Sequence, residues 1–567
     1  MELTRELHVK LVFVIGAAII ITRLFYIQVV RADELKIEGS GQYKSVSKVV
    51  PRRGDILSSD KYPLATAHSS YLLIADPKTV KPDYKEIVNQ LSQLLDKASS
   101  PEAKLKFEAN TIDNLSRDLR WIMLERKVSP LQKEKIESAK ISGLSFEEEF
   151  IRINPEASLA AHLLGFVGRD ENGQDKGYFG LEGYYNLNLA GFAGKLSEEK
   201  DLVGKPIMIG NSRKERVKQG RTLITSIDRP AQFLVERKLE EGLAKYGAKS
   251  GTVTLIEPSS GRILAMASLP SYTPSQYSLT NQESFKNPVV ADTYEPGSTF
   301  KVIVMAAAIN EGIVTPSSIC DRCSGPVTLD KYTIRTWDNK YRPNETMTDI
   351  ITNSDNVGMV YVGDKLGTEK FIEYYKLFGF SKATGIDLQE EIIPPQQPGP
   401  QWSPIDRSTA SFGQGIAVTP IQMVKAISVI ANGGKSVTPR VVDRIMDSGK
   451  EIPIPAATTQ QIISTQTAHQ ITQMMVEAVE KGESKWTKPK GFKIAGKTGT
   501  AQIPVSGHYD QEKTIASFIG FAPADNPKFA MLVTLQEPKS SPWGSETAAP
   551  LWFSIARDLF RLWGITS

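Results

Sequence analysis

DTYEPGSTFKVIVMAAAINEG, residues 292–312, places a serine and a lysine at the start of an apolar helix. The segment opens with a turn at Pro296 and Gly297, and the helix that follows is apolar on almost every side. Such a helix is normally buried, and a buried lysine needs a partner or a chemical use. Ser298 and Lys301 are three residues apart, so their side chains share one face. We expect the lysine to lie beside the serine hydroxyl.

This pair has the chemistry of an activated nucleophile. Burial lowers the pKa of a lysine, which leaves neutral amine to remove the serine proton. The helix N-terminus adds N–H groups and a positive dipole near a developing oxyanion. Spacing alone is not specific, because three other pairs share it: Ser45 with Lys48, Ser58 with Lys61, and Ser197 with Lys200. The apolar surroundings distinguish Ser298 and Lys301 from these pairs.

Two polar motifs follow in the chain. NSDNVG contains Ser354, Asp355 and Asn356. A second hydroxyl at Ser354 can pass a proton between the lysine and a leaving amine. The amide of Asn356 can hold a substrate carbonyl or the catalytic lysine. We therefore expect Ser354 and Asn356 to join the catalytic group.

AGKTGTAQ, residues 495–502, predicts a strand beside the cleft. Lys497 and Thr498 offer a cation and a hydroxyl to a substrate carboxylate. Gly499 removes a side chain, so that another backbone can lie alongside. The N–H of Thr500 can join that of Ser298 in an oxyanion hole.

Composition and cysteines exclude several classes of function. The chain has 567 residues, 23% charged residues and a net charge of +4, which is ordinary for a globular protein and gives no reason to expect a nucleic-acid partner. Cys320 and Cys323 are the two cysteines, and with five histidines they do not favour a four-ligand zinc site. A local disulfide and two unreactive thiols both remain possible. We expect no metal and no cofactor.

The N-terminus predicts a single membrane anchor. Residues 11–30 are uncharged apart from Arg23 and mostly apolar, and about 20 such residues cross the hydrocarbon layer. A cleaved signal peptide is the alternative, but no small-x-small cleavage site follows, and FYIQVVRADEL has the aromatic and charged residues of a membrane interface. Charge does not give the orientation, because basic residues lie on both sides of the span.

The rest of the chain predicts an α+β protein with two extramembrane domains. Residues 45–222 mix short strands, turns and an amphipathic helical region without a nucleophile, which favours an elongated supporting pedestal. Residues 250–564 start with a hairpin, contain all three motifs and end with another hairpin and a helix. We expect an antiparallel sheet flanked by helices there. Residues 1–10 form a short tail before the anchor.

The order Ser-x-x-Lys, Ser-Asp-Asn, Lys-Thr-Gly resembles the signature of penicillin-binding proteins and serine β-lactamases. The resemblance to class B, the monofunctional members, covers nearly the whole chain. It includes the anchor, RRGDIL at 52–57, RINPEASLAAHLLGFVG at 152–168, GLEGYYN at 180–186 and SFGQGIAVTPIQM at 411–423. YEPGSTFK and the last stretch are most similar to the cell-division member. SSDKYPLA at 58–65 departs from the family's usual Asp-Arg-Asn-Gly turn, which affects the expected pedestal and not the site.

The resemblance implies a peptidoglycan D,D-transpeptidase that cross-links stem peptides through a serine acyl-enzyme and is a target of β-lactams. It implies catalytic roles for Ser298, Lys301, Ser354 and Asn356, and substrate binding by Lys497, Thr498, Gly499 and Thr500. It also implies a catalytic domain outside the inner (cytoplasmic) membrane, working beside a glycan-polymerising membrane glycosyltransferase and other division proteins.

Five alternatives share parts of this pattern. An elongation-type transpeptidase and a D,D-carboxypeptidase would use the same motifs. A β-lactamase would need a deacylating Glu-x-x-Leu-Asn segment, but Glu390 and Glu391 in QEEIIPPQQPG lack that pattern and resemble a charged loop. A bifunctional class A enzyme would need glycosyltransferase motifs before Gly251, which the chain lacks. A non-catalytic division scaffold would not need Lys301 in an apolar helix.

Overall fold

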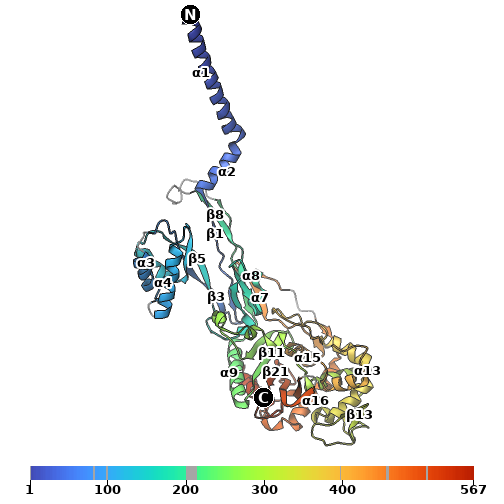
Figure 1. The fold of residues 1–567 in the computed structure, drawn as a ribbon. Coiled ribbons are helices and arrows are strands. Elements are labelled where there is room, and N and C mark those ends of the chain that lie inside the picture. Colours follow the sequence, from blue (N-terminus) through green and yellow to red (C-terminus); the bar gives the residue numbers. More distant parts are fainter. Residues whose placement is uncertain are drawn as a thin grey trace. The chain divides into compact units, whose positions relative to one another are not determined.

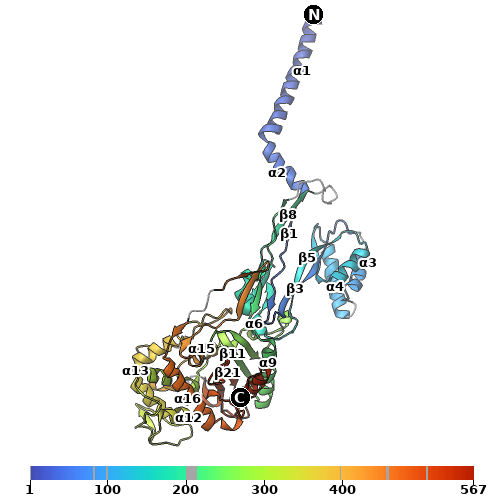
Figure 2. The ribbon, with the colours of Figure 1, turned by 180° about the vertical axis from the view of Figure 1, so that it is seen from behind.

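The computed structural model describes residues 2–80, 84–97, 100–199, 213–395, 397–454, 459–505 and 508–566. The chain divides into two compact units (Figures 1 and 2). The first contains Met1–Arg52, Ser69–Glu149 and Gly191–Gln219, and the second contains Arg53–His68, Phe150–Ala190 and Gly220–Ser567. Each unit is therefore assembled from segments that are distant in the sequence.

The N-terminal helix of the first unit can span a membrane. Thr4–Val30 is a helical stretch of 27 residues whose side chains are not buried in the protein. Among the described residues it is the one helix long and apolar enough to cross a bilayer. This agrees with the expected single anchor. The stretch comprises α1 (Glu2–Phe25) and a π-helical turn (Tyr26–Val30), and α2 (Ala32–Tyr43) follows.

The remainder of the first unit has a three-stranded sheet, β1-β8-β9, and a small α/β layer. In that layer, Leu73, Leu91 and Phe107 belong to one hydrophobic cluster, which joins strand β3 to helices α3 and α4. The elements are β1 (Lys44–Val49), β8 (Gly194–Glu199), β9 (Arg213–Lys214), β3 (Pro63–Ala75), α3 (Tyr84–Leu94), α4 (Pro101–Leu115), β4 (Ile122–Val128), α5 (Pro130–Ser138) and β5 (Leu144–Ile153).

A five-stranded antiparallel sheet, β12-β11-β21-β20-β19, is the centre of the second unit (Figure 1). Its side chains alternate between two faces. Met531 and Val533 share a hydrophobic cluster with α9 and α17, whereas Ala530 and Leu532 belong to the larger core with α11 and α15. The strands and the first two helices are β11 (Ser250–Ile256), β12 (Ile263–Leu269), β19 (Ala495–Val505), β20 (His508–Ala522), β21 (Phe529–Gln536), α9 (Arg229–Tyr246) and α17 (Ala548–Leu562).

These elements confirm several predictions from the sequence. β11 and β12 form the first hairpin, and β20 and β21 form the second. Asp228 caps α9 by accepting a hydrogen bond from the N–H of Ala231, and Pro230 stands in the first turn. Fold class is therefore as expected: an antiparallel sheet covered by helices.

Helices of the larger core surround the apolar helix predicted from residues 292–312. All residues of α11 (Lys301–Asn310) up to Ile309 are buried. Its neighbours are α13 (Asn356–Leu377), α16 (Thr465–Lys481) and α12 (Met347–Thr352). The unit also contains α10 (Pro288–Ala291), α14 (Pro404–Ser411), α15 (Pro420–Ala431), β13 (Val327–Leu329), β14 (Tyr332–Ile334), β15 (Lys435–Ser436) and β18 (Gln460–Gln461).

A buried ionic triad joins three of the motifs that carried the family resemblance. Glu182 Oε2 accepts from Arg53 Nε at 2.7 Å, and Glu182 Oε1 accepts from Arg152 Nε at 2.6 Å. Arg152 also donates to the carbonyl of Gly54 at 2.7 Å. Burial opposes ionisation of Glu182, but Arg152 and Arg53 outweigh it and hold the pKa of its carboxyl below the usual value. The surrounding elements are β2 (Ile56–Leu57), α6 (Ala161–Leu164), β6 (Phe166–Arg169), β7 (Asp175–Tyr178), α7 (Gly180–Tyr184) and α8 (Asn186–Ala190).

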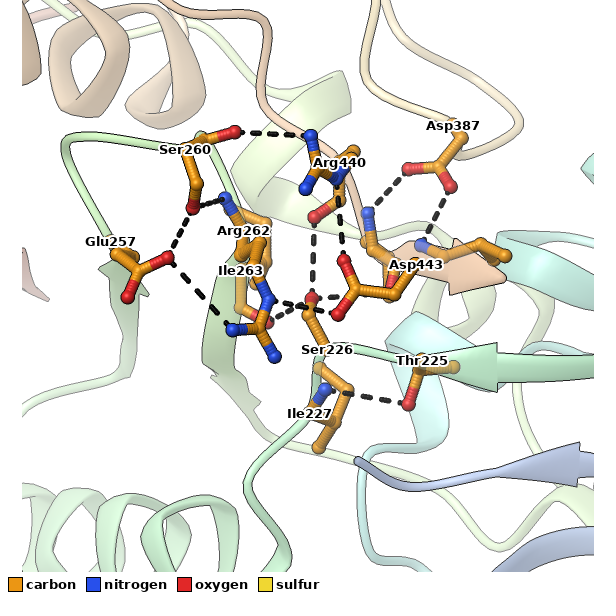
Figure 3. Close-up of polar contacts among 12 residues, drawn as sticks. Thr225, Ser226, Ile227, Glu257, Ser260, Arg262, Ile263, Asp387, Arg440 and Asp443 are labelled. Atoms are coloured by element: carbon orange, nitrogen blue, oxygen red, sulfur yellow. Dashed lines mark hydrogen bonds and ion pairs between the residues drawn. The ribbon is translucent and has the colours of Figure 1, made fainter. Parts of the chain in front are cut away.

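Figure 3 shows a polar junction beside the central sheet of the same unit. Ser226 Oγ donates to the carbonyl of Ile263 at 2.7 Å, and Asp387 accepts from the N–H groups of Val441 and Val442 at 2.6 and 2.8 Å. Asp387 thus satisfies backbone donors that would otherwise be buried without partners. The junction fixes β10 (Thr222–Thr225) and β16 (Val442–Asp447) to the sheet, and β17 (Lys450–Ile452) pairs with β16.

Candidate active site

The serine of the first motif lies on a tight turn before the buried helix. Gly297–Phe300 forms a 3-10 turn that leads directly into α11. Gly297 has φ +53°, a value that disfavours other residues, and its N–H donates to Gly413 at 3.0 Å. Thr299 Oγ1 closes the turn by donating to the carbonyl of Pro296 at 2.6 Å. Ser298 is half-buried and lines a small pocket of about 70 Å³.

Lys301 is fully buried, and its amine is held by the second motif. Its Nζ donates to the carbonyl of Ser354 at 2.6 Å and to Asn356 Oδ1 at 2.8 Å, with Ser354 Oγ at 3.3 Å. Burial lowers the pKa of Lys301 well below its usual value, the Lys497 cation lowers it further, and Asp355 opposes the shift. Among the described residues the hydrogen bonds of this amine therefore run to Ser354 and Asn356, and not directly to Ser298.

Local backbone geometry sets the direction of the second motif. Ser354 is buried and adopts φ +56°, the left-handed conformation that non-glycine residues rarely occupy. Asp355 caps α13 by accepting from the N–H of Gly358 at 2.9 Å. Asn356 Nδ2 donates to the carbonyl of Arg335 at 3.2 Å, which turns its Oδ1 toward Lys301.

Strand β19 brings a second buried lysine to the same hydroxyl. Lys497 Nζ donates to Ser354 Oγ at 2.9 Å and to Thr498 Oγ1 at 3.1 Å. Burial lowers the pKa of Lys497 to about 8, and Glu483 opposes the shift. Two lysines from distant parts of the chain thus meet at Ser354, a contact that the three motifs did not predict.

Strand β19 requires a glycine at position 499. A Cβ at Gly499 would come within 2.4 Å of Ser517 Oγ and 2.8 Å of Thr299 Cγ2. The strand can therefore lie against the turn that carries Ser298 only if position 499 has no side chain. Thr500, the next residue, lines the pocket, and its Oγ1 accepts from the N–H of Gly544 at 3.0 Å.

Glu483, Trp337 and Trp543 also line the pocket, and none of them belongs to a motif found in the sequence. Glu483 Oε2 accepts from Thr498 Oγ1 at 3.3 Å, and the ring centroids of Trp337 and Trp543 are 5.6 Å apart. Trp337 Nε1 donates to the carbonyl of Asn353 at 3.0 Å. These residues come from irregular segments without a repeating pattern, so no local signal predicts them.

Other sequence candidates have structural roles. Ser58 Oγ bonds with the carbonyl of Tyr62 at 3.1 Å inside a turn. Lys200 lies outside the described residues. Glu391 accepts from the N–H groups of Thr384 and Gly385, which fits the charged-loop interpretation. Cys320 and Cys323 form a local disulfide, and the described ranges contain no group of three or more acidic, histidine or cysteine residues that could hold a metal.

Two family models match the chain. Residues 251–561 match the penicillin-binding protein transpeptidase domain, and residues 48–225 match the penicillin-binding protein dimerisation domain. The chain belongs to the penicillin-binding proteins, and this pair of domains identifies it as a class B member. The family assignment made from the motifs is thereby confirmed, and the chain is an enzyme of the serine acyltransferase type.

Individual relatives agree over nearly the full length. The chain is 33% identical to stage V sporulation protein D of Bacillus subtilis, covering 98% of this chain and 85% of that protein. It is 30% identical to peptidoglycan D,D-transpeptidase FtsI of Escherichia coli, covering 97% and 90%. The fold matches penicillin-binding protein 2X from Streptococcus thermophilus (TM-score 0.75, 22% identity, 91% and 80% covered) and penicillin-binding protein 3 from Mycobacterium tuberculosis complexed with aztreonam (0.70, 23%, 92% and 98%).

Proposed function

We propose that this protein cross-links peptidoglycan stem peptides by D,D-transpeptidation, with Ser298 as the residue that carries the acyl group. The main support is the meeting of two buried lysines, Lys301 and Lys497, at the Ser354 hydroxyl in a pocket that Ser298 lines. A binding platform gains nothing from two cations that share one neutral acceptor. Proton transfer, by contrast, needs amines whose pKa values are lowered.

The hydrogen bonds of Lys301 favour its role as the base. A neutral amine has two N–H donors and one lone pair. The carbonyl of Ser354 and Asn356 Oδ1 take both donors, at 2.6 and 2.8 Å. The third contact of the amine is with Ser354 Oγ at 3.3 Å, so in the neutral form its lone pair faces that hydroxyl. Ser298, one helical turn away, is the hydroxyl that the reaction requires.

The reaction then proceeds in two balanced halves. Ser298 Oγ attacks the penultimate carbonyl carbon, and its proton passes to Lys301. The amide C–N bond breaks, and Ser354 relays a proton to the terminal D-alanine amine as it leaves. An amine from a second stem peptide then attacks the ester carbonyl carbon, and its proton passes through Ser354 to Lys301. The ester C–O bond breaks, and Lys301 returns the proton to Ser298 Oγ.

Two further groups assist the reaction. The N–H groups of Ser298 and Thr500 are assigned to the oxyanion, because both residues line the pocket. Lys497 and Thr498 are assigned to the terminal carboxylate of the donor peptide, since they supply a cation and a hydroxyl side by side.

The cellular setting follows from the relatives. One relative is named peptidoglycan D,D-transpeptidase FtsI, and another is named stage V sporulation protein D. We therefore assign this chain to wall synthesis at a septum. In this proposal residues 1–10 form the cytoplasmic tail, residues 45–222 are a pedestal outside the membrane, and residues 250–564 are the catalytic domain. A glycan-polymerising membrane glycosyltransferase and other division proteins are the expected partners.

Labelling with a fluorescent penicillin tests the nucleophile. Ser298→Ala in the full chain should abolish covalent label, and tryptic mass spectrometry of the unchanged protein should place the adduct on Ser298. Ser58→Ala is the matched control, because Ser58 and Lys61 repeat the spacing in a turn outside the pocket. Label that persists in Ser298→Ala, with a normal melting curve, would contradict the assignment.

Product analysis tests the reaction type. Donor and acceptor stem peptides on lipid-linked glycan polymer should give free D-alanine together with cross-linked dimers. Free D-alanine without dimers would identify a carboxypeptidase.

Imaging of the labelled protein in growing cells tests the cellular setting. A midcell band supports a septal role, and a dispersed sidewall pattern supports elongation.

A further inference from the structure

Glu483 places a carboxylate in the pocket beside the two lysines. It lines the same pocket as Ser298, Ser354 and Thr498, and it is the one acidic side chain among the described lining residues. Its Oε2 accepts a hydrogen bond from Thr498 Oγ1 at 3.3 Å. The same hydroxyl accepts from Lys497 Nζ at 3.1 Å. Glu483 is thus connected to Lys497 through one threonine.

A tight turn after α16 holds Glu483 in this place. The N–H of Gly482 donates to the carbonyl of Ala478 at 3.1 Å, and a Cβ at Gly482 would lie 2.3 Å from that oxygen and 2.8 Å from the carbonyl of Thr352. Ser484 is buried on the other side of Glu483. The backbone on both sides is therefore fixed, and the side chain reaches Thr498 from a constrained position.

The hydrogen bond to Glu483 occupies the Thr498 hydroxyl, which the proposed function assigns to the carboxylate of the donor peptide. Thr498 has one hydroxyl proton. While that proton is donated to Glu483, it cannot be donated to a substrate carboxylate. Negative charge on Glu483 also opposes a second carboxylate at the same place. The free pocket therefore already holds an anion where the proposed function needs one to enter.

We propose that Glu483 is a specificity-determining residue: its carboxylate occupies, in the free enzyme, the hydrogen-bonding position at Thr498 that the carboxylate of a donor peptide or β-lactam takes. The incoming anion displaces Glu483 from Thr498 before acylation. This proposal rests on the assignment of Lys497 and Thr498 to the substrate carboxylate. Because of Glu483, binding of an anion is less favourable than it would be beside the two lysines alone.

The test compares a carboxylate with its neutral ester. The second-order rate constants for acylation of the full chain in detergent by benzylpenicillin and by benzylpenicillin methyl ester are measured by intact-protein mass spectrometry. Glu483→Gln keeps an oxygen acceptor for Thr498 and removes the charge. The acid-to-ester ratio of rate constants should rise about three- to tenfold in Glu483→Gln, and the rise should shrink as salt screens the pocket.

The ratio isolates the effect on the carboxylate. Any change that Glu483→Gln causes through the basicity of Lys301 affects both ligands alike and cancels. In the unchanged protein the pKa of Lys497 is about 8, and loss of Glu483 lowers it, so both proteins are measured near pH 6.5 and again at a lower pH, where Lys497 is protonated in each. The matched control is Glu477→Gln, which removes a carboxylate from α16 that pairs with exposed Lys481 at 2.7 Å outside the pocket. Its ratio should stay within about twofold of the unchanged protein.

Two results would overturn the proposal. An acid-to-ester ratio that is unchanged or lower in Glu483→Gln would show that Glu483 does not compete with the carboxylate. Rate constants that fall by the same factor for acid and ester would make Glu483 a positioning residue for the lysines. Failure of the proposed function is distinguishable, because it would appear as no adduct on Ser298 before any change at Glu483.

Discussion

The second unit has two buried charged clusters, the Glu182 triad and the lysine pair at Ser354. The first cluster pairs opposite charges, and the second brings like charges together. In the triad, one carboxylate, Glu182, lies between the guanidinium groups of Arg53 and Arg152. In the pocket, the amines of Lys301 and Lys497 meet at one neutral hydroxyl. Burial is similar: Glu182 is 1% exposed and Lys301 is 0% exposed.

The partners decide what burial does. Opposite charges outweigh desolvation at Glu182 and keep its pKa low, so the carboxylate stays ionised and the triad cannot easily take up a proton. The hydrogen-bond partners of Lys301 are neutral, so desolvation and the Lys497 cation outweigh the opposing charge of Asp355, and the pKa of Lys301 falls. A buried charge with opposite charges around it therefore stabilises the fold, while a buried amine without them is ready to exchange a proton.

Replacing Lys301 should have the largest effect on acylation. Lys301→Met removes the base and should lower the second-order rate constant for penicillin acylation by about a thousandfold or more. It should leave the melting temperature unchanged or higher, because an amine with a high desolvation cost is replaced by an apolar chain. Stopped-flow acylation and thermal unfolding of the full chain measure the two effects.

Lys425→Met is the matched control for this change. Lys425 is also a buried lysine, with a pKa lowered by burial, and donates to the carbonyl of Thr384 at 3.2 Å outside the pocket. Acylation should be retained. Equal loss of acylation in both variants would remove the distinction between the pocket lysine and other buried lysines.

The triad should show the reverse pattern. Glu182→Gln leaves two buried guanidinium groups without their carboxylate and should lower the free energy of unfolding by about 3–5 kcal/mol. Molecules that remain folded should still be acylated at Ser298. Chemical denaturation gives the first quantity and titration with labelled penicillin the second.

An exposed pair calibrates the triad experiment. Glu241 pairs with Lys238 at 3.0 Å on α9, and Glu241→Gln should change the free energy of unfolding by less than about 0.5 kcal/mol. If Glu182→Gln cost no more than this, the triad would not be a stabilising centre.

Glu345 provides a third case, in which an acid lies near another acid. It is 4% exposed, and burial raises the pKa of its carboxyl to about 7, with Asp355 adding to the shift. Because the folded-state pKa exceeds the unfolded value, Glu345 stabilises the fold at low pH and loses that contribution as pH rises through about 7.

Glu345→Gln imitates the protonated form and removes this pH dependence. Relative to the unchanged protein, its free energy of unfolding should increase by about 2–3 kcal/mol between acidic and mildly alkaline pH. Denaturation of both proteins across that range measures the difference. Parallel stability curves would show that Glu345 does not titrate in this range.

Much of the fold could be predicted because its signals are local. The cap and proline of α9, the two hairpins and the continuous apolar run of α11 each occupy one short stretch of sequence. Ser298, Lys301 and the two later motifs were also found this way. Their spacing and residue types carry chemistry that is visible without a structure.

The rest depends on contacts between distant segments. The left-handed conformation of Ser354 has no signature in a single sequence, and it directs that residue toward Lys497, which lies 143 positions away. Glu483 is an ordinary acidic residue after a helix until the turn places it against Thr498. Local pattern therefore found the residues to which we assign the reaction, and it missed Glu483, which only the contact with Thr498 brings to them.

Two indoles that line the pocket give the protein a built-in optical reporter. Trp337 and Trp543 are 43% and 39% exposed, and both line the same pocket as Ser298. Indole emission responds to the polarity of its surroundings. A drug that enters this pocket should change the intrinsic fluorescence, so occupancy could be followed in real time without a dye.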